Sequence, residues 1–323
     1  MDYVNLGRTG LKVSRLCLGT MNFGPETSEA DSFHIMDKAL DQGVNFFDTA
    51  DVYVWKLGEG VTEQIIGRWF SHGGGRREKV VLATKVYGQM GEWPNTSRLS
   101  ALHIRRACDE SLRRLKTDYI DLYQMHHVDR DVTWDEIWQV LEQLCQAGKV
   151  LYIGSSNFAG WHIAQANETA RRRNFLGLVC EQPKYNLLCR TPELEILPAC
   201  QHYGLGVIPW SPLAGGLLAG GAAQAKSGRR ASRFARQELD TRGPQVAAYE
   251  QFCKDLGAAP GEVALAWLLH QPVVTAPIIG PRTSEQFESA LRALTLKLTR
   301  DSLRRLDELC PGPGGPAPEA FAW

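Results

Sequence analysis

Short apolar runs alternate with amphipathic segments about eight times along this chain of 323 residues. Short apolar strands that alternate with helices are typical of parallel βαβ units. Eight such units predict a closed (β/α)8 barrel, the TIM barrel of the α/β class, rather than an open sheet. We therefore expect a single barrel domain, with strand runs at residues 15–18, 44–47, 80–85, 120–125, 150–153, 178–180, 206–209 and 274–279.

Residues that favour helix ends separate these runs. Ser28, Ser100 and Thr133 stand where a side-chain oxygen can cap the first turn of a helix. Gly43 stands where a helix should end, and Pro192 stands at the start of one, where its missing N–H costs nothing. The predicted helices cover 28–43, 62–70, 133–148, 160–173 and 284–294, and two more begin after Ser100 and near Pro192.

Three segments lie outside the repeat. Residues 3–13 predict a β-hairpin that would plug the N-terminal end of the barrel. Residues 213–243 form a long connection after the seventh strand, rich in Gly, Ala and Arg. Residues 311–323 open with a run of Pro and Gly and predict an irregular C-terminal tail, which leaves 1–310 for the barrel domain.

Composition excludes several classes of protein. Lys and Arg together number 36, and so do Asp and Glu, whereas nucleic-acid binders and proteins that bind anionic membranes carry a basic excess. No apolar run approaches the length of a membrane helix, and the N-terminal residues lack the pattern of a secretion signal. We expect a cytoplasmic protein. Its eight cysteines are scattered, without the C-x-x-C spacing of a metal site, and predict buried free thiols and no bound metal.

Four ionisable side chains follow neighbouring strands of the predicted barrel. Asp48 and Tyr53 come after the second strand, Lys85 ends the third, and His126 ends the fourth. Active sites of such barrels lie at the C-terminal ends of the strands, so these groups should share one space. A nearby ammonium favours the phenolate of a tyrosine, whose ordinary pKa is about 10, and should lower that pKa toward the range useful for acid catalysis.

The remaining two groups complete the predicted chemistry. Asp48 would keep Lys85 charged, and His126 would hydrogen-bond the substrate oxygen. Each residue alone would more often be a surface ion pair or a packed side chain. Four complementary groups at successive strand ends favour catalysis: protonation of a carbonyl oxygen while hydride reaches the carbon.

The sequence resembles the aldo-keto reductase superfamily from residue 3 to about residue 309. Several separate motifs carry the resemblance in order, at residues 6–14, 45–53, 83–85, 121–126, 154–158 and 209–213. The resemblance implies Tyr53 as the general acid/base, tuned by Lys85 and Asp48, with His126 rather than His127 orienting the carbonyl. It also implies NADPH as cofactor and a small-molecule carbonyl compound as substrate.

The nicotinamide residues implied by the resemblance come from several strand ends. Ser156, Asn157 and Gln182 would hold the carboxamide, and Trp210 would stack on the ring. Gly19, Thr20 and Met21 match the stretch that lines the same ring. The chain has no convincing G-x-G-x-x-G fingerprint after its first strand, so the barrel mouth itself must hold the cofactor.

The phosphate-binding residues are expected in two later segments. Backbone contacts to the pyrophosphate would come from Ser211, Leu213, Gly215 and Leu217. A basic stretch would either cover that group or form a solvated loop; it contains Lys226, Arg229, Arg230, Arg233 and Arg236.

The adenosine end of the cofactor is expected at the start of the last barrel helix. Gly280 and Arg282 would bind the 2′-phosphate there, where a helix N-terminus already favours an anion, and Gln286 would contact the adenine. Ser289 and Ala290 stand where related sequences usually have a Glu-Asn pair, which should thin the adenine contacts.

The predicted activity is an NADPH-dependent carbonyl reductase. A finer resemblance is to actinobacterial members of deoxysugar pathways, the 2,3-reductases that act on nucleotide-linked 4-keto-6-deoxyhexoses. One alternative is a non-catalytic, NADPH-sensing protein like the channel-associated β subunits. A second is a phosphate-handling aldolase or isomerase in which Lys85 forms a Schiff base. Oligomeric state is left open.

Overall fold

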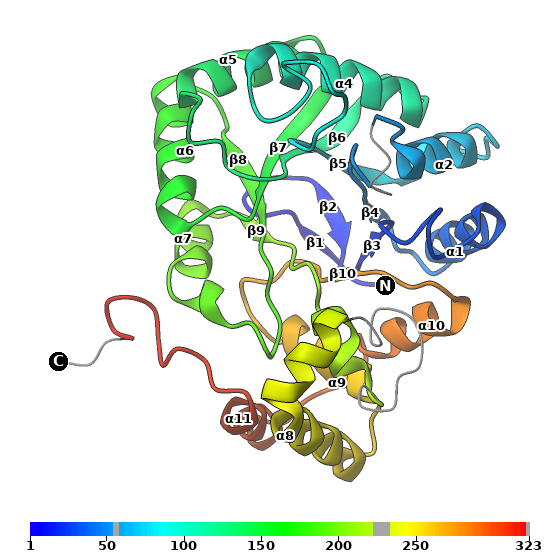
Figure 1. Cartoon of the computed structure of the whole chain (residues 1–323), viewed down its shortest axis with the longest axis vertical. Coiled ribbons are helices and arrows are strands. Elements are labelled where there is room, and N and C mark those ends of the chain that lie inside the picture. The colour runs from blue at the N-terminus through cyan, green and yellow to red at the C-terminus, as the bar shows by residue number, and fades with distance from the viewer. Residues whose placement is uncertain (54–57, 222–232, 321–323) are drawn as a thin grey trace.

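A computed structural model of the chain describes residues 1–53, 58–221 and 233–320. Its centre is a parallel sheet of eight strands in the order β10-β3-β4-β5-β6-β7-β8-β9 (Figure 1). The strands follow the predicted apolar runs in turn, as β3 (Cys17–Gly19), β4 (Phe46–Asp48), β5 (Val81–Val86), β6 (Ile120–Met125), β7 (Val150–Ser156), β8 (Leu178–Gln182), β9 (Gly206–Val207) and β10 (Ile278–Ile279).

Hydrogen bonds between the last two strand segments close the sheet into a ring. The Thr275 amide donates to the carbonyl of Val207 at 2.8 Å, and the Ile278 amide donates to that of Pro209 at 2.9 Å. A parallel bridge also joins Val207 to Val274. Together with the pairing of β10 and β3, these contacts confirm the predicted (β/α)8 barrel.

Helices cover the outside of this barrel (Figure 1). Ser28, Ser100 and Thr133 each accept a hydrogen bond from the backbone amide three residues on, as the capping signals predicted. Gly43 has a φ of +78° just beyond the first helix. The helices are α1 (Glu29–Asp41), α2 (Val61–Phe70), α3 (Arg76–Lys79), α4 (Ala101–Leu115), α5 (Trp134–Gln146), α6 (Gly160–Arg172), α7 (Ile196–Tyr203), α8 (Arg233–Leu256), α9 (Pro260–Leu269), α10 (Ser284–Arg292) and α11 (Arg300–Leu309), with 3-10 turns η1 (Thr191–Glu193) and η2 (Ala214–Ala219).

The N-terminal hairpin is present as an antiparallel pair, β1 (Tyr3–Asn5) and β2 (Lys12–Ser14). Leu6 and Val13 are fully buried and pack into a cluster with residues from the starts of the barrel strands. Gly7 lies so close to the start of β9 that a Cβ there would come 2.5 Å from the carbonyl oxygen of Gly204. The hairpin therefore plugs the N-terminal end of the barrel.

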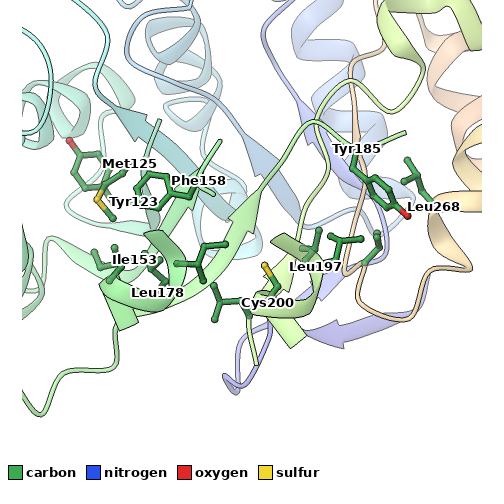
Figure 2. Packing of buried hydrophobic residues seen from close by; sticks show 14 of the residues in the cluster. Tyr123, Met125, Ile153, Phe158, Leu178, Tyr185, Leu197, Cys200 and Leu268 are labelled. Atoms are coloured by element: carbon green, nitrogen blue, oxygen red, sulfur yellow. The ribbon is translucent and has the colours of Figure 1, made fainter. Parts of the chain in front are cut away.

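The largest apolar core lies between the barrel strands and the outer helices. Along β6 the side chains alternate: Tyr123 and Met125 join this outer core, whereas Leu122 belongs to the cluster inside the barrel. Figure 2 shows Tyr123 and Met125 together with Ile153 and Phe158 in this layer. The same alternation directs the side chain of Gln124 into the barrel, where it reaches Asp48 of the candidate active site.

Two predictions about connections were wrong. Residues from 233 onward are helical in α8, so the connection after the seventh strand does not extend to 243; buried Val246 and Tyr249 anchor that helix despite Pro244 within it. Pro192 lies in the 3-10 turn η1, and the α-helix begins only at Ile196, because η1 first turns the chain after β8.

Several segments stand apart from the barrel repeat. Three residues of the predicted basic stretch lie outside the described residues: Lys226, Arg229 and Arg230. Residues 311–320 form no helix or strand. Among the described helices, none has the length and apolar character needed to cross a membrane.

Candidate active site

Lys85 joins the predicted catalytic groups at the C-terminal edge of the barrel. Its Nζ donates to Asp48 Oδ2 at 2.6 Å, to the carbonyl of Thr49 at 2.8 Å and to the hydroxyl of Tyr53 at 3.0 Å. The lysine is fully buried, and Asp48 and Tyr53 are buried with it. The ends of β4 and β5 lie side by side in the sheet, which brings these residues together although 37 positions separate Asp48 from Lys85.

Burial decides the charge state of this group. For Lys85 burial alone would lower the pKa, but Asp48 and Tyr53 outweigh it and the pKa is raised, so the ammonium stays charged. For Tyr53 burial raises the pKa, and Lys85 offsets only part of that increase. The expectation of a lowered tyrosine pKa was therefore wrong, because desolvation of the phenolate exceeds the attraction of the ammonium. Tyr53 is a neutral phenol that can give up a proton.

His126 lies next to Tyr53. The two rings meet edge to face, with their centroids 6.1 Å apart. Burial, followed by the nearby Lys85 charge and His127, holds the pKa of His126 well below its usual value. The imidazole is thus neutral, and one ring nitrogen can donate a hydrogen bond to an oxygen placed between the two rings.

Two glutamines that the sequence analysis did not assign to catalysis complete the surroundings of Asp48. Gln124 and Gln182 both donate from Nε2 to Asp48 Oδ1, at 3.0 and 2.9 Å. Gln182 had been predicted only as a nicotinamide ligand, and Gln124 had no predicted role. Gln124 could have been found from the β6 pattern, because it is the polar member of the set that alternates with Tyr123 and Met125.

The predicted nicotinamide residues lie beside this group and bond to one another. Trp210 Nε1 donates to Asn157 Oδ1 at 2.9 Å, and Asn157 Nδ2 donates to Ser156 Oγ at 3.0 Å. Ser156 Oγ in turn donates to the carbonyl of Gln182 at 2.9 Å. Asn157 also has a φ of +61°, a left-handed conformation that asparagine tolerates better than most residues. These bonds fix the indole of Trp210 at the barrel mouth.

The first barrel strand ends next to the same site. Gly19 ends β3, and a Cβ there would come 2.5 Å from Cγ2 of Ile278. Thr20 donates from Oγ1 to the carbonyl of Asp48 at 2.9 Å. Met21, the next residue, is half-buried. The Gly-Thr-Met stretch therefore lies against the backbone of Asp48.

A tight turn follows Trp210. Ser211 has a φ of +54°, and its Oγ accepts a hydrogen bond from the Gly215 amide at 3.1 Å. Leu213 is half-buried beside the turn and Leu217 is buried beneath it. A Cβ added at Gly215 would meet no atom within 4 Å, so space remains open against the backbone at this point.

The last predicted segment lies at the start of α10. The Arg282 amide donates to Oε1 of Gln286 at 2.8 Å, which makes Gln286 part of the helix cap. The guanidinium of Arg282 lies 3.4 Å from Oε2 of Glu26, an acidic neighbour that the sequence analysis missed. Gly280 accepts a hydrogen bond from the side chain of Asn22 at 2.8 Å.

The two residues that depart from related sequences have structural partners. Ser289 donates from Oγ to Oε1 of Glu262 at 3.0 Å, which turns its hydroxyl toward α9. Ala290 is buried in an apolar cluster that also contains Met36 and Ala39 of α1. The structure thus places both residues in contacts between helices.

The family of this chain follows from its similarity to known proteins. A model described as "Aldo/keto reductase family" matches residues 15–310. The chain belongs to the aldo/keto reductase family. It is an oxidoreductase, and members of this family act on small carbonyl compounds with NAD(P)H.

Three relatives show the range of this likeness. The chain is 55% identical over 327 residues, covering all of both chains, to "Uncharacterized oxidoreductase YrpG" of Bacillus subtilis. It is 34% identical to "Putative voltage-gated potassium channel subunit beta" of Schizosaccharomyces pombe, over 94% of this chain and 92% of the other. It is 32% identical to "Versiconal hemiacetal acetate reductase" of Aspergillus parasiticus, over 95% and 96% of the two chains.

Proposed function

We propose that this protein is an NADPH-dependent reductase of small carbonyl compounds, with Tyr53 as the proton donor. The observation that carries the proposal is the position of Lys85 Nζ, 2.6 Å from Asp48 and 3.0 Å from the Tyr53 hydroxyl, inside a buried site. The neutral phenol holds the proton that a reduced carbonyl oxygen needs. Bound NADPH supplies the hydride.

Each of the four residues has a distinct task in this scheme. His126 donates a hydrogen bond to the carbonyl oxygen and so orients it toward Tyr53. Tyr53 transfers its hydroxyl proton to that oxygen as negative charge develops there. The Lys85 ammonium stabilises the phenolate that remains, and Asp48 keeps the ammonium in place. The buried setting strengthens both charge interactions.

The barrel mouth offers groups that fit a nicotinamide dinucleotide phosphate. Oε1 of Gln182 forms no hydrogen bond with a described residue and is an acceptor suited to a carboxamide. The indole of Trp210, fixed by Asn157, offers a flat face. Arg282, beside the N-terminus of α10, supplies a cation for a 2′-phosphate, which supports NADPH over NADH.

A row of rings continues from His126, and we infer that it lines the substrate side of the site. His127 stacks on His126 with centroids 5.2 Å apart, and Tyr87 meets His127 edge to face, also at 5.2 Å. Arg98, in the loop after β5, forms an ion pair with Asp129, in the loop after β6, at 2.6 Å. A planar or polar carbonyl compound suits such a rim. The proposal of a nucleotide-linked 4-keto-6-deoxyhexose or its 2,3-enone as substrate rests on the sequence resemblance.

Two other functions make different predictions. The likeness to a protein named as a putative potassium channel subunit beta supports the alternative of a non-catalytic, NADPH-sensing protein. Such a protein would bind NADPH and turn over slowly or not at all. A Schiff-base enzyme would need Lys85 as a neutral amine, which its raised pKa and its three hydrogen bonds oppose.

The test is a fluorescence titration with NADPH and NADH, followed by turnover on an aromatic aldehyde, an α-diketone and a nucleotide-linked 4-keto sugar. We expect tighter binding of NADPH and turnover on at least one carbonyl compound. Tight binding with no turnover on any of them favours the sensing protein. If neither NADPH nor NADH binds, the proposal is contradicted.

A further inference from the structure

Gln124 is a fully buried polar residue inside the barrel, on the strand that carries His126. A primary amide in such a place costs free energy unless its donors and acceptor are paired. Neighbouring Leu122 on the same face is apolar, so burial alone does not call for an amide at position 124. Its hydrogen bonds give it a specific role.

The amides of Gln124 and Gln182 form a closed triangle with Asp48. Gln124 Nε2 donates to Asp48 Oδ1 at 3.0 Å, and Gln182 Nε2 donates to the same oxygen at 2.9 Å. Gln182 Nε2 also donates to Gln124 Oε1 at 3.2 Å. The carboxylate of Asp48, already bonded to the Lys85 ammonium, only accepts hydrogen bonds, and this determines which end of each amide faces it.

The triangle determines what Gln182 can offer a ligand. Both hydrogens of its Nε2 point to partners inside the barrel, one to Asp48 and one to Gln124. Oε1 is therefore the atom of this amide left for a ligand. An acceptor in this position selects a ligand group that donates a hydrogen bond, such as the NH2 of a carboxamide.

We propose that Gln124 is a positioning residue that holds the Gln182 amide with its oxygen toward the cofactor. Through the shared Oδ1 it also links the cofactor's carboxamide to the carboxylate that anchors Lys85. The inference rests on the proposed use of a nicotinamide cofactor. Without the Gln124 oxygen, only the hydrogen bonded to Asp48 keeps a partner, so the Gln182 amide can rotate about that one bond and its Oε1 is no longer held toward the cofactor.

The test compares the dissociation constants of NADP+ and its 3-acetylpyridine analogue, measured by quenching of protein fluorescence. The analogue has a methyl group in place of the amide NH2, so it cannot donate to Oε1 of Gln182. We expect the native protein to bind NADP+ about fivefold more tightly than the analogue, the usual effect of one hydrogen bond. In Gln124→Met, which keeps the volume and removes the amide, this preference should fall to about one. Gln143→Met, an exposed glutamine on α5, should keep it.

A Gln124→Glu variant gives a second readout, because it removes the amide but keeps an acceptor oxygen at position 124. A carboxyl group at position 124 keeps an oxygen that can accept from Gln182 Nε2 whether it is protonated or ionised, so the preference for NADP+ over the analogue should persist in this variant. This variant also serves if Gln124→Met does not fold. A native preference that persists in Gln124→Met, or that is lost in a Gln124→Glu protein that still binds NADP+, would overturn the inference. Failure of the native protein to bind NADP+ at all would instead overturn the proposed function.

Discussion

Removing the Lys85 ammonium should destabilise the fold far more than removing a lysine from a surface ion pair. In Lys85→Met the carboxylate of Asp48, 2% exposed, keeps its two amide donors but loses its cation. Leaving one partner of a buried pair uncompensated costs about 3–5 kcal/mol of unfolding free energy. Adding Asp48→Asn removes the buried charge, so the double variant should recover a large part of that loss.

Guanidinium chloride unfolding, followed by tryptophan fluorescence, measures these differences. Lys149→Met is the matched control, because Lys149 pairs with Asp109 at 2.6 Å with side chains 40% and 46% exposed, and its loss should cost less than about 1 kcal/mol. Lys85→Met should also lose turnover while still binding NADPH. Equal stability losses in the two Lys→Met variants, or a double variant no more stable than Lys85→Met, would refute the electrostatic reasoning.

Three further outcomes follow from individual contacts. Burial raises the pKa of Glu181 from its ordinary 4.5 to about 7, so the folded chain holds this proton more tightly than the unfolded chain does. The free energy of unfolding should therefore fall by about 3 kcal/mol from pH 4.5 to 7. In Glu181→Gln, the denaturant midpoint should no longer show this dependence on pH. Arg282→Met should weaken NADPH binding about tenfold and leave NADH binding nearly unchanged in fluorescence titrations. His127→Ala should raise KM for the preferred carbonyl substrate several-fold with a smaller change in kcat, as measured by steady-state kinetics.

Each of these outcomes can fail in a defined way. A Glu181→Gln protein with the native pH slope would assign the titration to other groups. Equal weakening of both nucleotides by Arg282→Met would mean that Arg282 does not distinguish the 2′-phosphate. An unchanged KM in His127→Ala would mean that the row of rings at His127 and Tyr87 does not contact the substrate.

Local signals in the sequence predict the barrel well, because several helix starts and all eight strand runs are marked by adjacent residues. Ser28, Ser100 and Thr133 cap their helices, and the eight apolar runs appear as eight strands. The contact of Asp48 with Lys85 follows from the same reasoning, since parallel strand ends share one edge. By contrast, the Gly-, Ala- and Arg-rich composition of residues 213–243 predicted a connection, whereas residues from 233 onward belong to α8, which buried Val246 and Tyr249 anchor.

Contacts that depend on three-dimensional burial could not be read from local patterns. The direction of the Tyr53 pKa shift depends on how completely the ring is desolvated, which the sequence does not state. The bond from Gln124 to Asp48 joins residues 76 positions apart, and its meaning depends on which amide atom faces the carboxylate. Glu26 beside Arg282 is likewise separated from its partner by most of the chain.

The central claim is that Tyr53 donates the proton in an NADPH-dependent reduction. Single-turnover oxidation of bound NADPH by the best substrate of the carbonyl panel, compared between the native protein and Tyr53→Phe, tests it most directly. The account predicts a rate reduced by a factor on the order of 100 or more, with NADPH affinity within about twofold of native. A Tyr53→Phe protein that oxidises NADPH at the native rate would contradict it.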